Sequence, residues 1–245
     1  MYNLFKMMRY QLVRDRLVWG TMAMSLLLGF FMANGYIDAN LGEVAYTAQN
    51  LADIFRGMVY DSTFLMVLLA PLLALRLGLQ FSKRTVGRLV SAGHKRGAVY
   101  ICLVVINLVV FNIAMLLYPL TGVLRESVRF GFAGGTAVFI DIGRMAVYSL
   151  LLNSAMFLLA MVICFFLRSS LRAMATTALA FFVLALLLAY GMGMGWSVAF
   201  LPMVQIRYAV VATSWWQPEA VIIGVIWCIV LMLLGWQCFR RCDLT

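Results

Sequence analysis

Apolar residues dominate the chain in six long runs that are separated by short polar segments. The runs extend over residues 17–35, 58–79, 98–120, 142–167, 173–195 and 220–239. A membrane-spanning α-helix needs about 20 apolar residues to cross a hydrocarbon core of about 30 Å. Each run reaches that length, so the pattern predicts an all-α integral membrane protein with six transmembrane helices, built as a single transmembrane domain over residues 1–245.

The segment before the first run predicts an amphipathic helix. In YNLFKMMRYQLVR, residues 2–14, the residues near one side of a helix are apolar, namely Leu4, Phe5, Met8, Leu12 and Val13. The basic residues fall largely on the other faces, namely Lys6, Arg9 and Arg14. A helix of this kind lies in the membrane interface. Residues 1–16 are therefore interpreted as an interfacial helix, with a frayed N-terminal segment as the alternative.

The stretch before the last run, residues 196–219, is apolar but interrupted. It contains Pro202 and Pro218 and is rich in tryptophan. Because proline removes a backbone donor and ends helices, a single clean span is not expected here. The stretch predicts short re-entrant or interfacial helices, with Trp215 and Trp216 at the depth of the lipid headgroups.

The loop between the second and third runs, FSKRTVGRLVSAGHKR over residues 81–96, is unusually basic. It holds five Lys or Arg and the single histidine of the chain. Each such cation would cost about 2.5–3.5 kcal/mol at the centre of a bilayer, so the loop stays outside the lipid. Phe81, Thr85 and Leu89 recur at helical spacing, with Ser82 as a candidate N-cap and Gly93 as a C-terminal stop. The pattern predicts a short amphipathic helix.

Three roles are open for this helix. It could lie on anionic lipid, it could only fix the topology, or it could bind a groove on a soluble partner with Leu89 and Val90 as anchors and the basic residues as a polar rim. The residues alone do not separate these roles.

Composition agrees with a membrane protein. The mean hydropathy is +0.99, and 65% of the residues are apolar whereas only 11% are charged. A soluble domain of this length has about 25% charged residues. The net charge of +10 lies beside apolar runs and is not interleaved with aromatic residues on a polar surface, so we expect no nucleic-acid partner.

The basic residues predict the orientation. With the N-terminus in the cytoplasm, fourteen of the 19 Lys and Arg fall on the cytoplasmic side: Lys6, Arg9, Arg14, Arg16, Arg76, Lys83, Arg84, Arg88, Lys95, Arg96, Arg168, Arg172, Arg240 and Arg241. The outer segments contain Arg56, Arg125, Arg129 and Arg207. Cytoplasmic loops carry an excess of Lys and Arg, so both termini are predicted to be cytoplasmic.

Motifs for self-contained catalysis are missing from the sequence. There is no G-x-x-x-x-G-K-[ST] phosphate loop and no G-x-G-x-x-G. His94 is the only histidine, so no H-E-x-x-H zinc helix can form and no metal site is expected. We therefore expect a non-enzymatic chain that binds no cofactor of its own.

The basic loop resembles a segment of known transporters. Phe81, Arg84, Thr85, Leu89, Ser91, Gly93 and Arg96 occur in the order seen after the second span in permease subunits of type-2 family ABC exporters. Val90 stands where the family has a second Leu, and an acidic residue often found before the Thr is missing. The layout of a basic lead-in, six spans and broken helices before the last span is also similar. The resemblance in motif covers about fifteen residues, and the resemblance in architecture covers the whole chain.

The resemblance implies a partner ATPase. In that family the segment is a coupling helix that sits in a cleft of a separate subunit, and two permeases join two ATPases, which bind ATP and Mg. The implied contact residues here are Lys83, Arg84, Thr85, Arg88, Leu89, Val90, Ser91 and His94, with Arg168 and Arg172 of RSSLRA in a second, smaller contact. The resemblance also implies the cytoplasmic (inner) membrane of a bacterium, a second copy of the permease as homodimer or close paralogue, and alternating access.

Polar residues inside apolar runs are candidates for a translocation path. They are Asp61, Asn107, Asn112, Asp141, Arg144 and Asn153. Asp141 and Arg144, three apart, are expected to pair with each other. The two asparagines of the third run are expected to bond between helices. Arg76 is expected to reach the membrane interface with its long side chain.

Few charges and many Met and Phe along such a path favour a hydrophobic or amphipathic cargo. Relatives that move toxin-like peptides make a peptide the first choice, and lipids and drugs are open. An ATP-independent secondary transporter or channel is the alternative function, and a membrane anchor or sensor subunit is a third.

Overall fold

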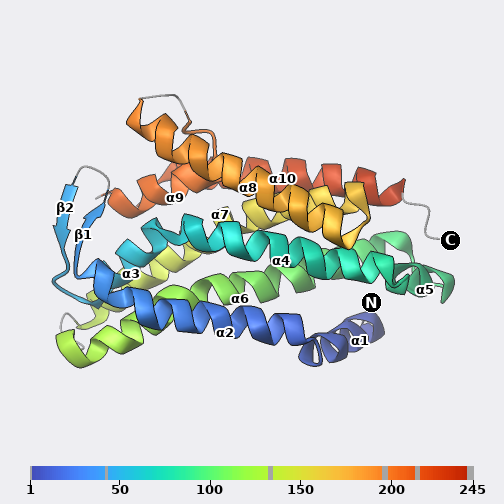
Figure 1. Cartoon of the computed structure of the whole chain (residues 1–245), viewed down its shortest axis with the longest axis horizontal. Helices are drawn as coiled ribbons and strands as arrows, with labels where there is room; N and C mark the ends of the chain where they lie inside the picture. Colours follow the sequence, from blue (N-terminus) through green and yellow to red (C-terminus); the bar gives the residue numbers. More distant parts are fainter. Residues whose placement is uncertain (1, 42–43, 132–134, 195–197, 213–215, 242–245) are drawn as a thin grey trace.

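Long helices run side by side along the longest axis of the molecule in the computed structural model (Figure 1). The structure describes residues 2–41, 44–131, 135–194, 198–212 and 216–241. The helices are α1 (Tyr2–Val13), α2 (Arg16–Met32), the 3-10 helix η1 (Ala33–Tyr36), α3 (Leu51–Tyr60), α4 (Ser62–Ser82), α5 (Thr85–Ser91), α6 (Arg96–Phe130), α7 (Gly135–Leu167), α8 (Ser170–Gly193), α9 (Pro202–Val211) and α10 (Pro218–Arg240).

Six of these helices are long and apolar enough to cross a membrane, as the sequence predicts. They are α2 with η1, α4, α6, α7, α8 and α10. The chain is therefore a multi-pass membrane protein. Within the part of the chain that the structure describes, α1 and the end of α10 lie at the same end of the bundle (Figure 1).

Two helices are longer than the apolar runs that predicted them. α6 has 35 residues and α7 has 33, which at 1.5 Å per residue gives about 50 Å each and exceeds a hydrocarbon core of about 30 Å. Charged residues such as Arg125 and Glu126 end the apolar run but are good helix formers, so the helix continues through them.

The second predicted span is divided. α3 and α4 meet at Asp61, and α3 begins with a capping box in which Asn50 and Asp53 satisfy each other's backbone N–H groups. The predicted run began at residue 58 and included the polar residues Asp61, Ser62 and Thr63, which were not interpreted as a helix boundary. Because of the break, α3 packs as a separate short helix beside α6 and α7.

A small β-hairpin departs from the all-α prediction. β1 (Asp38–Leu41) pairs antiparallel with β2 (Val44–Thr47), with Asp38 opposite Thr47 and Leu41 opposite Val44. The backbone N–H of Ala48 donates to the carbonyl of Ile37 at 2.8 Å and closes the base of the hairpin. Strands this short carry little hydrophobic periodicity, so the sequence pattern did not predict them.

Both prolines of the interrupted stretch stand at the start of a helix. Pro202 begins α9 and Pro218 begins α10, where a missing N–H costs no hydrogen bond. α9 packs against α3, α7 and α10. Trp216 is exposed, and Trp215 lies outside the described residues.

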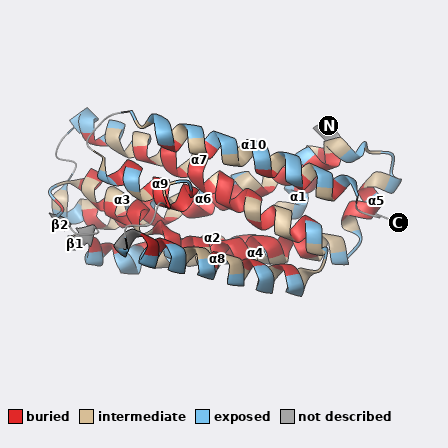
Figure 2. Ribbon diagram, turned by 90° about the horizontal axis from the view of Figure 1, so that it is seen from above, coloured by how far each residue is buried: buried red, intermediate tan, exposed pale blue. Residues whose placement is uncertain are grey.

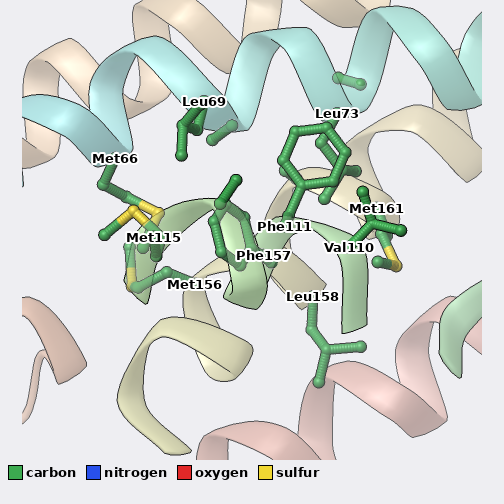
Figure 3. Packing of buried hydrophobic residues seen from close by; sticks show 14 of the residues in the cluster. Met66, Leu69, Leu73, Val110, Phe111, Met115, Met156, Phe157, Leu158 and Met161 are labelled. Carbon is green, nitrogen blue, oxygen red and sulfur yellow. The ribbon is translucent and has the colours of Figure 1, made fainter. Parts of the chain in front are cut away.

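Three helices form the centre of the bundle. In α4, α6 and α7 more than half of the most apolar stretch is buried, whereas α2, α8 and α10 bury less than a third (Figure 2). Figure 3 shows Met66, Leu73, Phe111, Phe157 and Met161 from the three central helices packed together. The peripheral helices expose their apolar side chains outward, as expected for a lipid-facing surface.

A glycine sets the distance between α4 and α8. A Cβ at Gly78 would lie 2.6 Å from the Cα of Ser170, at the first residue of α8. Because that neighbour is backbone, it cannot rotate away. Gly78 therefore permits the close approach of these two helices.

We expect Gly78→Ala to lower the free energy of unfolding by about 1–3 kcal/mol, because the added methyl group separates α4 from α8. Gly20→Ala is the matched control, since a Cβ at Gly20 meets nothing within 4 Å. It should be neutral or stabilising by up to about 1 kcal/mol. Thermal unfolding of the purified protein in detergent measures both. Equal effects would contradict the close contact.

Candidate functional site

One end of the bundle gathers most of the basic residues. This cationic end comprises α1, α5, the α7–α8 junction and the end of α10, and it lies opposite the hairpin end formed by β1, β2, α3 and α9 (Figure 1). The exposed cations of the cationic end are Lys6, Arg9, Arg14, Arg16, Lys83, Arg84, Arg88, Lys95, Arg96, Arg168, Arg172, Arg240 and Arg241. An end with this charge suits anionic lipid or an acidic protein surface.

α5 is held in place by its two ends. Arg84 precedes it in the left-handed region, with φ 54°, and turns the chain sharply out of α4. After the helix, Gly93 has φ 89°; its N–H donates to the carbonyl of Val90 at 3.0 Å, and the N–H of His94 donates to that of Leu89 at 3.3 Å. This is a Schellman motif, so Gly93 acts as the predicted stop.

Two expectations about this helix are corrected. Ser82 is the last residue of α4 and is not the N-cap of α5. Leu89 is only 6% exposed and belongs to the protein's own core together with Val86, so it is not available as an anchor for a partner. The physical reason is that a two-turn helix buries its apolar side on the nearest cover, which here is α4 and α6.

The surface that α5 presents is polar and basic. Lys83, Arg84, Arg88 and Ser91 are exposed, whereas the remaining predicted contact residues are half-buried, namely Thr85, Val90 and His94. Any partner would therefore meet cations and hydroxyl groups first.

The second predicted contact lies at the same end. Arg168 ends α7 in the left-handed region, with φ 54°, and its guanidinium donates to the carbonyl of Arg241 at 3.2 Å. Arg172 is exposed on the first turns of α8. Arg84 and Arg168 thus share an uncommon backbone conformation, which costs of order 1–3 kcal/mol where the residue is not glycine. Both stand at tight helix–helix junctions.

An aromatic cluster connects the two predicted contact regions, α5 and the α7–α8 junction, on the side that faces the core. Phe81 of α4 lies 5.9 Å from Phe165 of α7, and Phe165 lies 5.6 Å from Phe239 of α10. Tyr100 of α6 is 5.5 Å from Phe239 and donates its hydroxyl to the carbonyl of Met232 at 2.7 Å. Since edge-to-face pairs add to area burial, four helices are tied together directly behind α5 and the α7–α8 junction.

Arg76 forms a buried polar cluster that the sequence did not suggest. Its side chain is buried, with Nε 2.8 Å from Asp15 and an NH group donating to Asn107. Arg76 was expected to reach the membrane interface with its long side chain; the structure shows that this side chain is 4% exposed and that its charge is paired with Asp15 at the α1–α2 junction. Asp15 also accepts from the backbone N–H of Leu17 and so caps α2.

A polar cleft of about 300 Å³ opens beside this cluster. It lies between the α1–α2 junction and the α4–α5 junction, and its charged lining residues are Arg14, Asp15, Arg16, Arg76 and Lys83. Four cations face one carboxylate, so the cleft favours an anionic group.

The six candidate path residues do not form one site. Asn107 accepts from Arg76, Asn112 donates to Ser154 of α7 at 2.9 Å, and Asn153 donates to Ser149 at 2.8 Å. Asp141 and Arg144 are 4.0 Å apart, as their spacing predicted, and Asp61 is 3.9 Å from Arg207.

The hairpin end has polar contacts that sequence reasoning missed. Arg207 of α9 lies over the ring of Tyr60 at 4.7 Å while it faces Asp61. The hydroxyl groups of Tyr36 and Tyr118 are 3.1 Å apart in the core. These pairs join residues from different helices, so no local spacing could have revealed them.

We expect Asp15→Asn to lower the free energy of unfolding by about 1–3 kcal/mol. Asn keeps the helix cap but leaves the buried Arg76 without its carboxylate partner. Breaking a fully buried ion pair costs about 3–5 kcal/mol, and the smaller value expected here reflects the 26% exposure of the Asp15 side chain. Asp15→Ala should cost about 1 kcal/mol more, because it also removes the cap. Thermal unfolding in detergent measures both, and a wild-type stability for Asp15→Asn would contradict the pairing.

Comparison with known proteins gives no assignment: no protein-family model matches the chain, and no curated protein matches it.

Proposed function

We propose that the chain is the membrane-spanning permease subunit of an ATP-driven ABC exporter. Its cationic end faces the cytoplasm, with α1 as an interfacial helix, α5 as the coupling helix and α9 as a re-entrant helix at the outer side. A separate ATPase subunit binds ATP and Mg and drives alternating access. Two copies of the permease, or this chain and a close paralogue, join two ATPases in the inner membrane of a bacterium.

The observation that carries the proposal is the placement of α5. A short helix with exposed cations stands at the end of the bundle, between two long apolar helices, and its backbone is fixed by Arg84 and Gly93. The aromatic contact between Phe81 and Phe165 connects it to the α7–α8 junction. A push on either element would reach the central helices α4 and α7, which is what energy coupling requires.

Charge complementarity supports an acidic protein partner. Arg88 and Ser91 are exposed on α5, and the polar cleft beside Lys83 favours a carboxylate. The chain has no phosphate-binding motif of its own, which agrees with a division of labour between two subunits.

The cargo proposed is hydrophobic or amphipathic, with a peptide as first choice. The central helices are rich in Met and Phe, for example Met66, Met115 and Met161, which are buried in the core and would line a path only when these helices separate during transport. Met-rich surfaces adapt to varied apolar ligands. Asn112 and Asn153 each retain a buried side-chain oxygen that accepts no hydrogen bond from the described residues, and such acceptors suit the amides of a peptide.

An ATP-independent secondary transporter or channel is the alternative. The buried pair of Arg76 and Asp15 favours it, since ionisable residues within a bundle are common in ion-coupled carriers. In such a protein the pair would change partners during transport, and the cationic end would fix only the topology.

The experiment is co-purification of the tagged chain from its native membrane. We expect a polypeptide with a G-x-x-x-x-G-K-[ST] motif in stoichiometric amount and ATPase activity in the preparation. Arg88→Glu should reduce the bound ATPase by about tenfold or more, because a like charge then faces an acidic surface, and Arg88→Gln should reduce it less.

Arg129→Glu is the control, because Arg129 is also exposed on a helix but lies at the far end of α6. It should leave the ATPase bound. If the purified chain alone, reconstituted in vesicles, moves solute at the full rate without any ATPase, the alternative is correct.

A further inference from the structure

We propose that the groove between α1, α2 and α6 binds an acidic phospholipid, with its acyl chain along α6 and its phosphate over Lys6 and Arg9. The inference is independent of the proposed function, because it concerns the chain alone. It rests on the shape of the groove, on its charges and on the absence of partners for these charges among the described residues.

The floor of the groove is apolar and directed along the bundle. Val105, Val109 and Ile113 succeed one another at every fourth residue of α6, so they form one stripe of about 12 Å along the helix. Met22 of α2 and Phe5 of α1 form the sides. The groove has a volume of about 480 Å³ and is open to the outside, as an acyl chain entering from the bilayer requires.

Two cations stand at one end of this apolar floor. Arg9 was expected on another face than Phe5 and Leu12, but it is four and three residues from them and lines the groove together with both. Lys6 lines the groove from the neighbouring face of α1. The same two cations border a second hollow of about 500 Å³ with Tyr10 and Val13. The groove and this second hollow thus meet at the two charges, which stand where the headgroup of a lipid would lie if its acyl chain occupied the groove.

Neither cation is neutralised within the part of the chain that the structure describes. No carboxylate forms an ion pair with Lys6 or Arg9 there, whereas Asp15, the acid of the α1–α2 junction, is bound to Arg76. Arg14 lies over the ring of Tyr10 at 4.3 Å. The two free charges favour a phosphate diester, and a zwitterionic lipid would bring a cation of its own beside them.

The position of Trp19 indicates the depth at which α1 lies in the membrane. Trp19 is 58% exposed on the first turns of α2, and its indole N–H donates to the carbonyl of Val13 at 2.8 Å. Tryptophan collects at the boundary between headgroups and hydrocarbon. α1 therefore lies where a lipid phosphate is found, and the stripe on α6 runs from there into the hydrocarbon.

The test is lipid binding to the purified chain in neutral detergent, followed by native mass spectrometry. Phosphatidylglycerol is the acidic probe and phosphatidylcholine is the matched zwitterionic one. We expect retained phosphatidylglycerol in clear excess. The double variant Lys6→Gln with Arg9→Gln should weaken it by about fivefold for each cation removed. Val109→Trp, which fills the groove and leaves the charge unchanged, should also weaken it.

Lys95→Gln with Arg240→Gln is the control, because it removes the same charge from the same end of the bundle but outside both the groove and the polar cleft. It should leave binding within twofold of the wild type. Equal loss in both double variants would overturn the proposal, since it would show only a general attraction of anionic lipid to the cationic end. So would equal retention of the two lipids, or a second copy of the chain in the groove, detected as a dimer that Val109→Trp dissociates.

Discussion

The cost of placing a cationic side chain in hydrocarbon controls the arrangement of this protein. Thirteen exposed cations stand at one end of the bundle, outside the apolar helical segments that lipid would surround. Arg76, which is buried, meets Asp15 and Asn107. Because a lone charge there would be far more costly than a paired one, the position of Asp15 at the start of α2 and the position of Arg76 near the end of α4 depend on each other. The same pair fixes the α1–α2 junction, and with it the groove above α6.

Concentrating charge at one end leaves the protein with two different cationic surfaces. On α5 the apolar side chains pack into the core, so the exposed surface of this helix is polar and cationic, which suits a protein partner. On α1 the cations border an apolar groove, which suits a lipid. The distinction comes from what lies beside the charges, and a count of charges would not reveal it. Behind α5, the cluster of Phe81, Phe165 and Phe239 connects the polar end to the central helices.

The sequence predicted the features that depend on hydropathy averaged over a long run or on the residue types that end a helix. Six apolar runs gave six helices, and Gly93 ended α5. Pro202 and Pro218 were interpreted only as interruptions, but each stands at the start of a helix. The sequence did not predict the break at Asp61, because apolar residues stand on both sides of it, or the hairpin at 38–47, because strands of four residues carry little hydrophobic periodicity. The inward turn of Leu89 and the pairing of Arg76 with Asp15 depend on which helix lies opposite, which spacing along one helix cannot tell. A single acid between Arg14 and Arg16 was the one available sign of that pair.

The central claim is that charge segregation places the cationic end on the cytoplasmic side and the hairpin end on the other. Cysteine labelling with a membrane-impermeant maleimide tests it directly, in a chain whose five cysteines are replaced by alanine. Ser91→Cys reports on α5, and Val128→Cys reports on the far end of α6, where the side chain is 92% exposed. The account predicts that Ser91→Cys reacts only in inverted vesicles and Val128→Cys only in intact cells. Reaction of both from the same side, or of Ser91→Cys in intact cells, would contradict it.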